Sequence, residues 1–245
     1  MITLKQESSP CGRIRDGSPE SLFEALAASM NAIAEARPAP FSIGLTGGST
    51  PLAFYDWVVR REALTPGVIH GAVWGVSDER MVPLSDEASN FGNADRQLLE
   101  PLGIPDGRKL PWPVQVDPHS AARAFEMRFH ERFVSTRAFD LCLLGMGDDG
   151  HTASIFPDSP LLGIDSANHF APVEVLGKGW RLSITPEGLR ACGRIIVLVT
   201  GAKKAQVLRE VHCGPPGRYP VQLLSRFADR VEWLVDEAAW GQDSR

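Results

Sequence analysis

Among the six histidines of the chain, His151 has the neighbours that best suit catalysis. It follows Asp148, Asp149 and Gly150 in a polar turn, rather than lying on the apolar face of a helix. An imidazole titrates near neutral pH, and a nearby carboxylate can fix its tautomer, as a general base requires. We therefore take His151 and Asp149 as a candidate catalytic pair; the alternative is a histidine that only caps a loop. The other five histidines lack the H-E-x-x-H spacing, so no catalytic metal is expected.

A glycine-rich segment supplies groups that suit an anionic substrate. In residues 46–51, Thr-Gly-Gly-Ser-Thr-Pro, Gly47 and Gly48 allow backbone N–H groups to approach an oxyanion. Ser49 and Thr50 add hydroxyls near the start of a predicted helix, whose dipole favours negative charge. The alternative is a tight turn with Thr50 as the N-cap and the following proline in the first helical turn.

Two further segments carry cations that could bind a phosphate or carboxylate. In Ser77-Asp-Glu-Arg80, Arg80 suits bidentate recognition of such a group, and the flanking acids Asp78 and Glu79 could orient it or bind sugar hydroxyls. Lys203 and Lys204 begin a predicted helix, where cations oppose the helix dipole unless an anion lies near. The alternatives are a surface ion-pair cluster and lysines on a solvated helical turn.

These segments follow stretches whose apolar residues predict strands. The predicted strands cover residues 41–45, 72–76, 139–144, 194–200 and 231–235. The predicted helices cover residues 18–36, with Ser18 as N-cap, and 51–61, 89–100, 119–134 and 203–212. Alternating strands and helices indicate an α/β fold: a mostly parallel, Rossmann-like sheet with helices on both faces. Ligands of such sheets bind at the carboxyl ends of the strands, so we expect the four polar turns to converge there.

Length and composition indicate one folded domain over residues 1–245. The chain has 43% hydrophobic and 22% charged residues and contains neither a low-complexity linker nor a visible repeat. A net charge of -5 does not favour nucleic acid as a partner. The chain lacks an apolar run long enough for a membrane span or a secretory signal, so no membrane partner and a cytoplasmic location are expected. The four cysteines form no C-x-x-C pair and are predicted to be reduced. A monomer is the simplest expectation, although the sequence does not determine the oligomeric state.

Three catalytic motifs of other enzyme classes can be compared with this chain. Residues 145–150, Gly-Met-Gly-Asp-Asp-Gly, match G-x-G-x-x-G and raise a dinucleotide-binding enzyme as an alternative. However, Pro157 and Pro160 would stop the helix that this motif requires. A Walker loop is absent, and a proline stands where a G-x-S-x-G elbow needs its last glycine.

Taken in order, these segments resemble the 6-phosphogluconolactonases of the glucosamine-6-phosphate isomerase/6-phosphogluconolactonase family. The resemblance covers most of the chain and rests on residues 46–51, 77–80, 89–91 (Ser-Asn-Phe), 145–157 (Gly-Met-Gly-Asp-Asp-Gly-His-Thr-Ala-Ser-Ile-Phe-Pro) and 199–204 (Val-Thr-Gly-Ala-Lys-Lys). The long glycine-histidine segment is its most specific part. Lys203 and residues 176–180 depart from the family pattern and leave contacts at the edge of the substrate open.

The resemblance implies hydrolysis of 6-phospho-D-glucono-1,5-lactone to 6-phospho-D-gluconate in the oxidative pentose phosphate pathway, without metal or cofactor. It implies catalytic roles for His151, Asp149 and Arg80. It also implies that the sugar-phosphate lactone is bound by Gly47, Gly48, Ser49, Thr50, Asp78, Arg80, Asn90 and Lys204.

Two other functions stay open beside lactone hydrolysis. The related glucosamine-6-phosphate deaminases continue the histidine motif with an Asn-Glu-Pro-like stretch, whose glutamate assists proton transfer. This chain has Ile155-Phe-Pro157 there, and a phenylalanine cannot move protons, which favours lactone hydrolysis. A sensor that binds a sugar phosphate without turnover is the non-enzymatic alternative.

Overall fold

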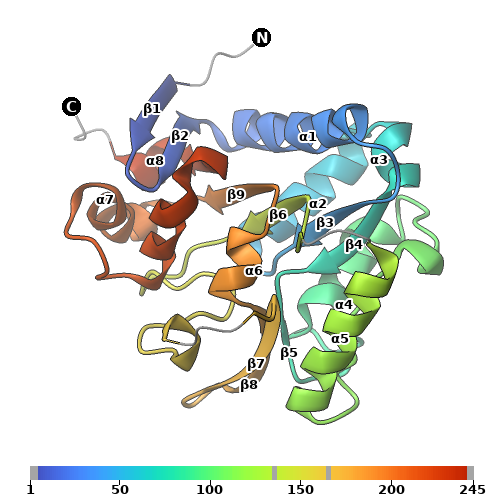
Figure 1. Cartoon of the computed structure of the whole chain (residues 1–245). Coiled ribbons are helices and arrows are strands. Elements are labelled where there is room, and N and C mark those ends of the chain that lie inside the picture. The colour runs from blue at the N-terminus through green and yellow to red at the C-terminus, as the bar shows by residue number, and fades with distance from the viewer. Residues whose placement is uncertain (1–4, 134–136, 164–166, 242–245) are drawn as a thin grey trace.

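A seven-stranded sheet forms the centre of the computed structural model, which describes residues 5–133, 137–163 and 167–241 (Figure 1). The strand order is β1-β2-β10-β9-β6-β3-β4. Only the β1–β2 pair is antiparallel, and the other neighbours run parallel. The strands are β1 (Lys5–Ser9), β2 (Gly12–Gly17), β3 (Phe41–Leu45), β4 (Ala72–Val76), β6 (Leu141–Leu144), β9 (Arg194–Val199) and β10 (Val231–Asp236). The five predicted strands are confirmed, and the N-terminal hairpin was not predicted.

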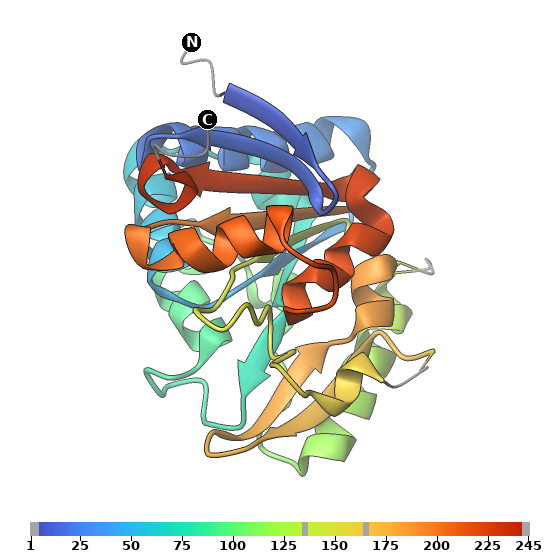
Figure 2. The same ribbon diagram turned by 90° about the vertical axis from the view of Figure 1, so that its left-hand side faces the viewer.

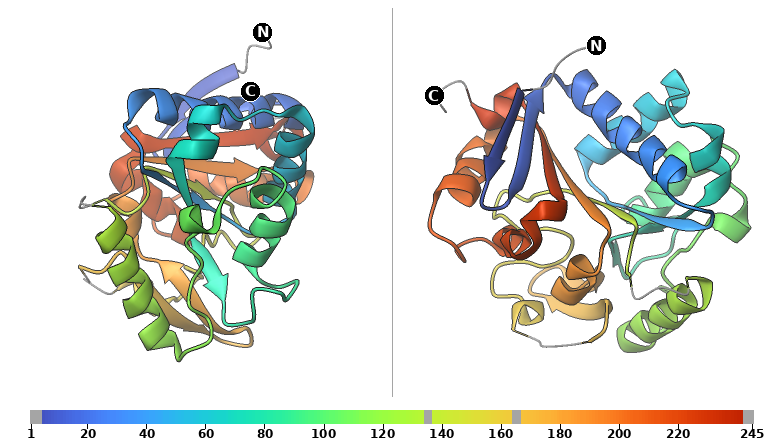
Figure 3. Two further views of the ribbon diagram at one scale, coloured as in Figure 1. Left: turned by 90° about the vertical axis from the view of Figure 1, so that its right-hand side faces the viewer. Right: turned by 45° about the horizontal axis from the view of Figure 1, so that its top comes forward.

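The central strands lie between two layers of helices. Every residue of β3, β4 and β6 is buried, as expected for parallel strands covered on both faces. Helices α1 (Pro19–Ala36), α2 (Ser49–Arg61) and α3 (Pro66–Gly71) cover one face, and α6 (Pro186–Arg190), α7 (Ala205–Cys213) and the 3₁₀ segment η5 (Pro220–Arg230) cover the other (Figure 3). Neither these helices nor the others in the described part of the chain are long and apolar enough to cross a membrane.

The helix starts agree with the sequence at α1 and differ at α2. The Ser18 hydroxyl accepts a hydrogen bond from the backbone N–H of Ser21, so Ser18 is the N-cap, as predicted. Helix α2 begins at Ser49 with Gly48 as its N-cap, so the alternative with Thr50 as N-cap is wrong. The reason is local: Gly48 has a φ of 108°, a conformation that suits glycine and starts the helix two residues earlier.

A second, antiparallel sheet has the order β5-β8-β7 and lies beside the carboxyl ends of the main sheet (Figure 2). Its strands are β5 (Asp78–Arg80), β7 (Phe170–Val175) and β8 (Gly179–Ile184), and α5 (Pro118–Arg132) packs on it. The polar turn predicted at 77–80 is therefore wrong in conformation: Asp78 pairs with Ser183 and Arg80 with Arg181. The short remaining helices are α4 (Asn90–Ala94), η1 (Asp95–Leu99), η2 (Asp106–Arg108), η3 (Pro160–Leu162), η4 (Ala202–Lys204) and α8 (Glu237–Trp240).

The direction in which the chain crosses the sheet changes between β3 and β6. From β3 the chain goes outward to β4, whereas β6 lies on the other side of β3 and leads to β9 and β10. Such a topological switch point leaves a crevice at the carboxyl ends of the two strands. The loops that follow β3 and β6 are therefore placed to form a ligand site.

Close packing beside this switch point depends on a glycine in β3. The ring of Phe139 lies across Gly44 in β3 and Gly75 in β4, and a Cβ atom built on Gly44 would lie 2.7 Å from the ring. A Cβ on Gly75 would lie 3.4 Å from the same ring. The aromatic side chain thus occupies the space that a side chain at Gly44 would need, and it is in ordinary contact distance of Gly75.

Candidate active site

A cavity of about 340 Å³ lies at the carboxyl ends of β3 and β6, between the two sheets. All four predicted segments line it, through Thr46–Gly48, Asp78 with Arg80, the loop after β6, and Lys204. Their predicted convergence is therefore confirmed. A larger cavity of about 670 Å³ lies at the amino ends of β9 and β10, and it is lined by none of the predicted site residues. We place the candidate active site in the smaller cavity because the groups that suit catalysis meet there.

His151 and Asp149 form a hydrogen-bonded pair at the edge of this cavity. The distance between His151 Nδ1 and Asp149 Oδ1 is 2.5 Å, and the backbone N–H of His151 donates to the same oxygen. Burial opposes ionisation of Asp149, but the hydrogen bonds from His151 outweigh it, so the pKa of Asp149 lies below its usual value. An ionised Asp149 holds the proton of the imidazole on Nδ1, which leaves Nε2 as the basic nitrogen.

The imidazole is held by its surroundings as well as by the carboxylate. The Phe156 ring stacks on His151 with the ring centroids 4.1 Å apart. A Cβ atom on Gly147 would lie 2.0 Å from His151 Nδ1, so only glycine fits there without a shift. Gly150 has a φ of 71° and packs against Tyr219, which fixes the turn before the histidine. Gly147 and Gly150 therefore serve the placement of His151.

Positive charge surrounds the rest of the cavity. Arg80 and Lys204 line it, as predicted, and Lys204 forms an ion pair with Asp148. Lys178 and Arg181 line it too and were missed by sequence reasoning. Burial lowers the pKa of Arg181, and the neighbouring charge of Arg80 adds to this effect. Four cations around one small cavity suit a phosphorylated ligand.

The two missed cations come from the β7–β8 hairpin. The Lys178 ammonium lies 4.6 Å from the centroid of the Phe156 ring, in a cation–π contact beside His151. Arg181 is the β8 partner of Arg80 in the second sheet. The available sequence indication of Lys178 was its place between two glycines and between two apolar stretches, a pattern typical of a tight turn. In the structure Gly177 and Gly179 both have positive φ.

Asp78 and Asn90 line the cavity and bind each other. The Asn90 amide donates to the Asp78 carbonyl at 2.9 Å, and the Ser154 hydroxyl donates to the Asp78 carboxylate at 2.7 Å. Asn90 also lies so close to Gly47 that a Cβ there would meet its side-chain oxygen at 1.9 Å. These contacts join the glycine-rich turn, β5, α4 and the histidine loop.

Tyr55 holds the turn after β3, and the two residues that follow the turn lie apart from the cavity. The Tyr55 hydroxyl donates to the Thr46 carbonyl at 2.7 Å and accepts from the Thr46 N–H. Ser49 and Thr50 lie in the first turn of α2 and are outside the cavity lining, and the Thr50 hydroxyl bonds that of Thr200 at 2.6 Å. Their part in substrate binding stays a prediction.

Glu79 anchors α4 to the second sheet. It is fully buried, and its carboxylate accepts hydrogen bonds from the Ser89 hydroxyl and from three backbone N–H groups, those of residues 80, 90 and 91. Burial raises its pKa against the opposing effect of these bonds. Glu79 thus positions Arg80 and Asn90 and is itself outside the cavity lining.

The fold and the site together define a doubly wound α/β protein with a His–Asp pair in a cationic pocket at the switch point of its sheet, an arrangement suited to acid–base chemistry on a phosphorylated ligand. The sequence profile of the glucosamine-6-phosphate isomerases/6-phosphogluconolactonase family matches residues 17–233, and the chain belongs to this family.

Several named relatives are similar along most of the chain. The 6-phosphogluconolactonase of Haemophilus influenzae is 32% identical over 205 residues, which are 82% of this chain and 86% of the relative. The human 6-phosphogluconolactonase is 33% identical over 82% of this chain and 80% of its own length. The structure of the Trypanosoma cruzi 6-phosphogluconolactonase superposes with a TM-score of 0.80 at 26% identity and covers 100% of this chain and 99% of that one. A monomeric glucosamine-6-phosphate deaminase, 18% identical with a TM-score of 0.76 over 92% of this chain and 98% of its own, shares the fold.

Proposed function

We propose that the chain hydrolyses 6-phospho-D-glucono-1,5-lactone to 6-phospho-D-gluconate, as in the oxidative pentose phosphate pathway. The observation that carries this proposal is the 2.5 Å contact of His151 with Asp149 at the edge of a cavity lined by four cations. Family membership and the names of the relatives support it. The stacking of Phe156 on His151 also supports it, because an apolar ring occupies the place where the resembling deaminases carry a proton-transferring glutamate.

The proposed reaction needs one base and no covalent intermediate. His151 Nε2 takes a proton from a water molecule as its oxygen attacks the lactone carbonyl, and the carbonyl becomes a tetrahedral oxyanion. The bond from this carbon to the ring oxygen then breaks, and the imidazolium returns its proton to that oxygen, so the products are the acid and the freed hydroxyl. General acid–base help of this kind contributes about 10²- to 10⁴-fold to the rate.

The cations of the cavity would bind the phosphate and position the lactone. In this proposal, Arg80, Lys204 and the backbone of Gly47 and Gly48 hold the phosphate, and Arg181 adds charge to the same wall. In this proposal Arg80 would also stabilise the developing oxyanion. The ion pair of Lys204 with Asp148 is the contact that an incoming phosphate would replace or share.

The proposal includes a reaction without metal or cofactor, in the cytoplasm. A lactone is an activated ester, so a correctly placed imidazole is sufficient to activate water. We expect EDTA to leave the rate of hydrolysis unchanged. A loss of activity that is reversed by added metal would contradict this part of the proposal.

The decisive experiment measures hydrolysis of the lactone, generated in situ from glucose 6-phosphate, above its spontaneous background. The wild-type chain should accelerate hydrolysis, and His151→Ala should abolish the acceleration. His70→Ala, which changes an exposed histidine of α3 outside the cavity lining, is the control and should keep full activity.

The alternatives give different outcomes in the same set of assays. A sensor would bind 6-phosphogluconate equally well with and without His151→Ala and would show no rate in either form. A deaminase would release ammonia from glucosamine 6-phosphate, and a dinucleotide enzyme would quench tryptophan fluorescence on NADP binding. Absence of lactone hydrolysis by folded wild-type protein would refute the proposed function.

A further inference from the structure

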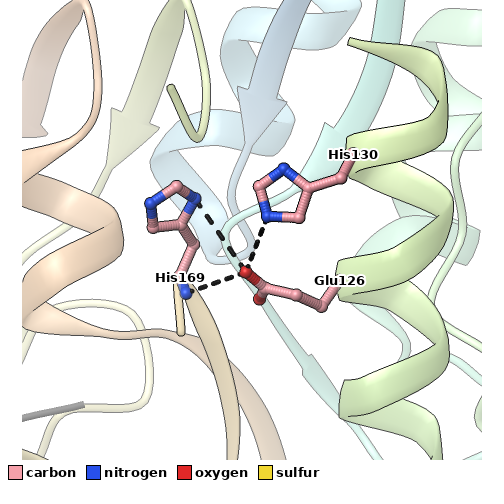
Figure 4. Close-up of side chains that lie close together, drawn as sticks. All are labelled: Glu126, His130 and His169. Carbon is pink, nitrogen blue, oxygen red and sulfur yellow. Dashed lines mark hydrogen bonds and ion pairs between the residues drawn. The ribbon is translucent and has the colours of Figure 1, made fainter. Parts of the chain in front are cut away.

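A second group of titratable side chains lies where α5 packs against the second sheet (Figure 4). Glu126 and His130 are one turn apart on α5, and His169 directly precedes β7. The three side chains face one another, and their potential ligand atoms all lie within 4.8 Å of each other. They are outside the lining of the candidate active site, so its chemistry does not explain them.

The carboxylate at the centre of this group is held by the backbone of the second sheet. Glu126 Oε1 accepts from the backbone N–H of His169 at 3.1 Å, and Oε2 accepts from that of Phe170 at 2.9 Å. Oε1 also lies 3.0 Å from His130 Nε2. The carboxylate is therefore fixed in orientation, as the hydrogen-bonded carboxylates of metal sites are.

One nitrogen of the group lacks a hydrogen bond. His169 is only 8% exposed, and its Nδ1 has no hydrogen-bond partner in the part of the chain that the structure describes. Figure 4 shows this nitrogen turned toward Glu126, but the 4.0 Å separation from Oε1 is too long for a hydrogen bond. A buried ring nitrogen that faces a carboxylate and a second imidazole without a bond to either requires an explanation.

We propose that Glu126, His130 and His169 bind a divalent transition-metal ion, with Zn²⁺ the best match to the donor set. Two imidazole nitrogens and one carboxylate oxygen are ligands that zinc prefers. A tetrahedral zinc site needs donors separated by about 3.3 Å, given bond lengths of about 2.0 to 2.1 Å. The separations of 3.0 and 4.0 Å on either side of Oε1 bracket that value, and all three donors lie within 4.8 Å of one another, so shifts of about 1 to 1.5 Å would complete the site. The His130 side chain is 42% exposed, which leaves a fourth position for water.

The ion would join α5 to the second sheet, whose strand β8 borders the active site. α5 supplies two ligands, and the third precedes β7, which pairs with β8, the strand that carries Arg181. Its expected effect is on the stability of the second sheet, because His151 and Asp149 lie on a different loop. This inference is independent of the proposed lactone hydrolysis.

The test uses the full chain, freed of metal by a chelator that is then removed by dialysis, and titrated with Zn²⁺ in a calorimeter. We expect one equivalent to bind, and Tm to rise by about 5 to 10 °C when free zinc is 100 times Kd. Co²⁺ bound in place of zinc should give the visible absorption of a four- or five-coordinate ion. These readouts do not depend on catalysis, so a failed lactone assay would leave them intact.

Two histidine variants of α5 give the matched comparison. His130→Ala changes a largely exposed ring and should fold normally, lose zinc affinity at least tenfold, and lose the Co²⁺ absorption. His119→Ala changes an exposed histidine about 16 Å from His130 along the same helix and should keep both. Absence of binding by the wild-type chain, or equal binding by wild type and His130→Ala, would overturn the proposal and leave an ordinary Glu–His cluster.

Discussion

Replacement of Gly147 by alanine tests the placement of the catalytic imidazole without altering any group that takes part in the reaction. The new Cβ would lie 2.0 Å from His151 Nδ1 and 2.7 Å from Asp149 Oδ1. An ordinary contact with the ring nitrogen needs about 3.4 Å, so the imidazole must retreat by about 1.4 Å. The 2.5 Å bond to Asp149 cannot survive a shift of that size in the same geometry.

A misplacement of about 1 Å at a reacting group can cost about 100-fold in rate, or about 2.7 kcal/mol of transition-state stabilisation. We therefore expect kcat/KM of Gly147→Ala for the lactone to fall about 100-fold. The fall should not exceed about 10⁴-fold, the upper range for general acid–base catalysis. Tm should change little, because the displaced ring lies at the edge of an open cavity.

The assay is lactone hydrolysis above background, together with thermal unfolding of each variant. Gly107→Ala is the control, because a Cβ at Gly107 meets nothing within 4 Å and its φ is ordinary. It should keep wild-type activity. If Gly147→Ala hydrolysed the lactone at more than a third of the wild-type rate, the inference that this glycine sets the position of His151 would be refuted.

Three further predictions concern the supports of the site and the stability of the chain. Glu79→Gln leaves backbone donors facing an amide N–H group, so it should lower the free energy of unfolding by about 3 kcal/mol and Tm by about 6 to 12 °C. The exposed control Glu87→Gln should change neither value. Equal Tm values for the two variants would contradict the proposed anchor. Arg80→Met should raise KM and lower kcat together, because phosphate binding also positions the lactone, and a surface control, Arg60→Met, should change neither. Burial lowers the pKa of His212 to about 4, against about 6.5 in an unfolded chain. As pH falls, the unfolded chain therefore binds the proton first, and the free energy of unfolding should drop by about 2 kcal/mol from pH 7.5 to 5. Urea unfolding of His212→Phe at both pH values should show a loss smaller by that amount, and the same loss in both proteins would argue against this origin.

The parallel core of the fold was predictable because its strands are mostly apolar. Residues 41–45 and 72–76 form β3 and β4 with the predicted bounds, and 139–144 became β6 with a start at Leu141. The second sheet was not predictable from local pattern. β5 has only three residues, two of them acidic, and it becomes a strand because β8, about 100 residues later, supplies its hydrogen bonds.

The site residues were predictable where they lie in turns that follow predicted strands. The prediction failed for residues that lie on strands distant in sequence. His151 and Asp149 are separated only by Gly150, so their pairing is local in the sequence. Lys178 and Arg181 reach the cavity only through the pairing of β8 with β5, which no spacing in the sequence indicates. The group of Glu126, His130 and His169 was not predictable for the same reason, because His169 lies on a separate element.

The packing of Phe139 across two glycines has a consequence for how this sequence can vary. Alanine at Gly44 alone would collide with the ring at 2.7 Å, and a smaller residue at position 139 alone would leave a cavity in the core. The two changes made together relieve each other, so their costs are not additive. Positions 44 and 139 thus tolerate substitution together but not one at a time. We therefore expect these two positions to change slowly in evolution, even though they take no part in binding.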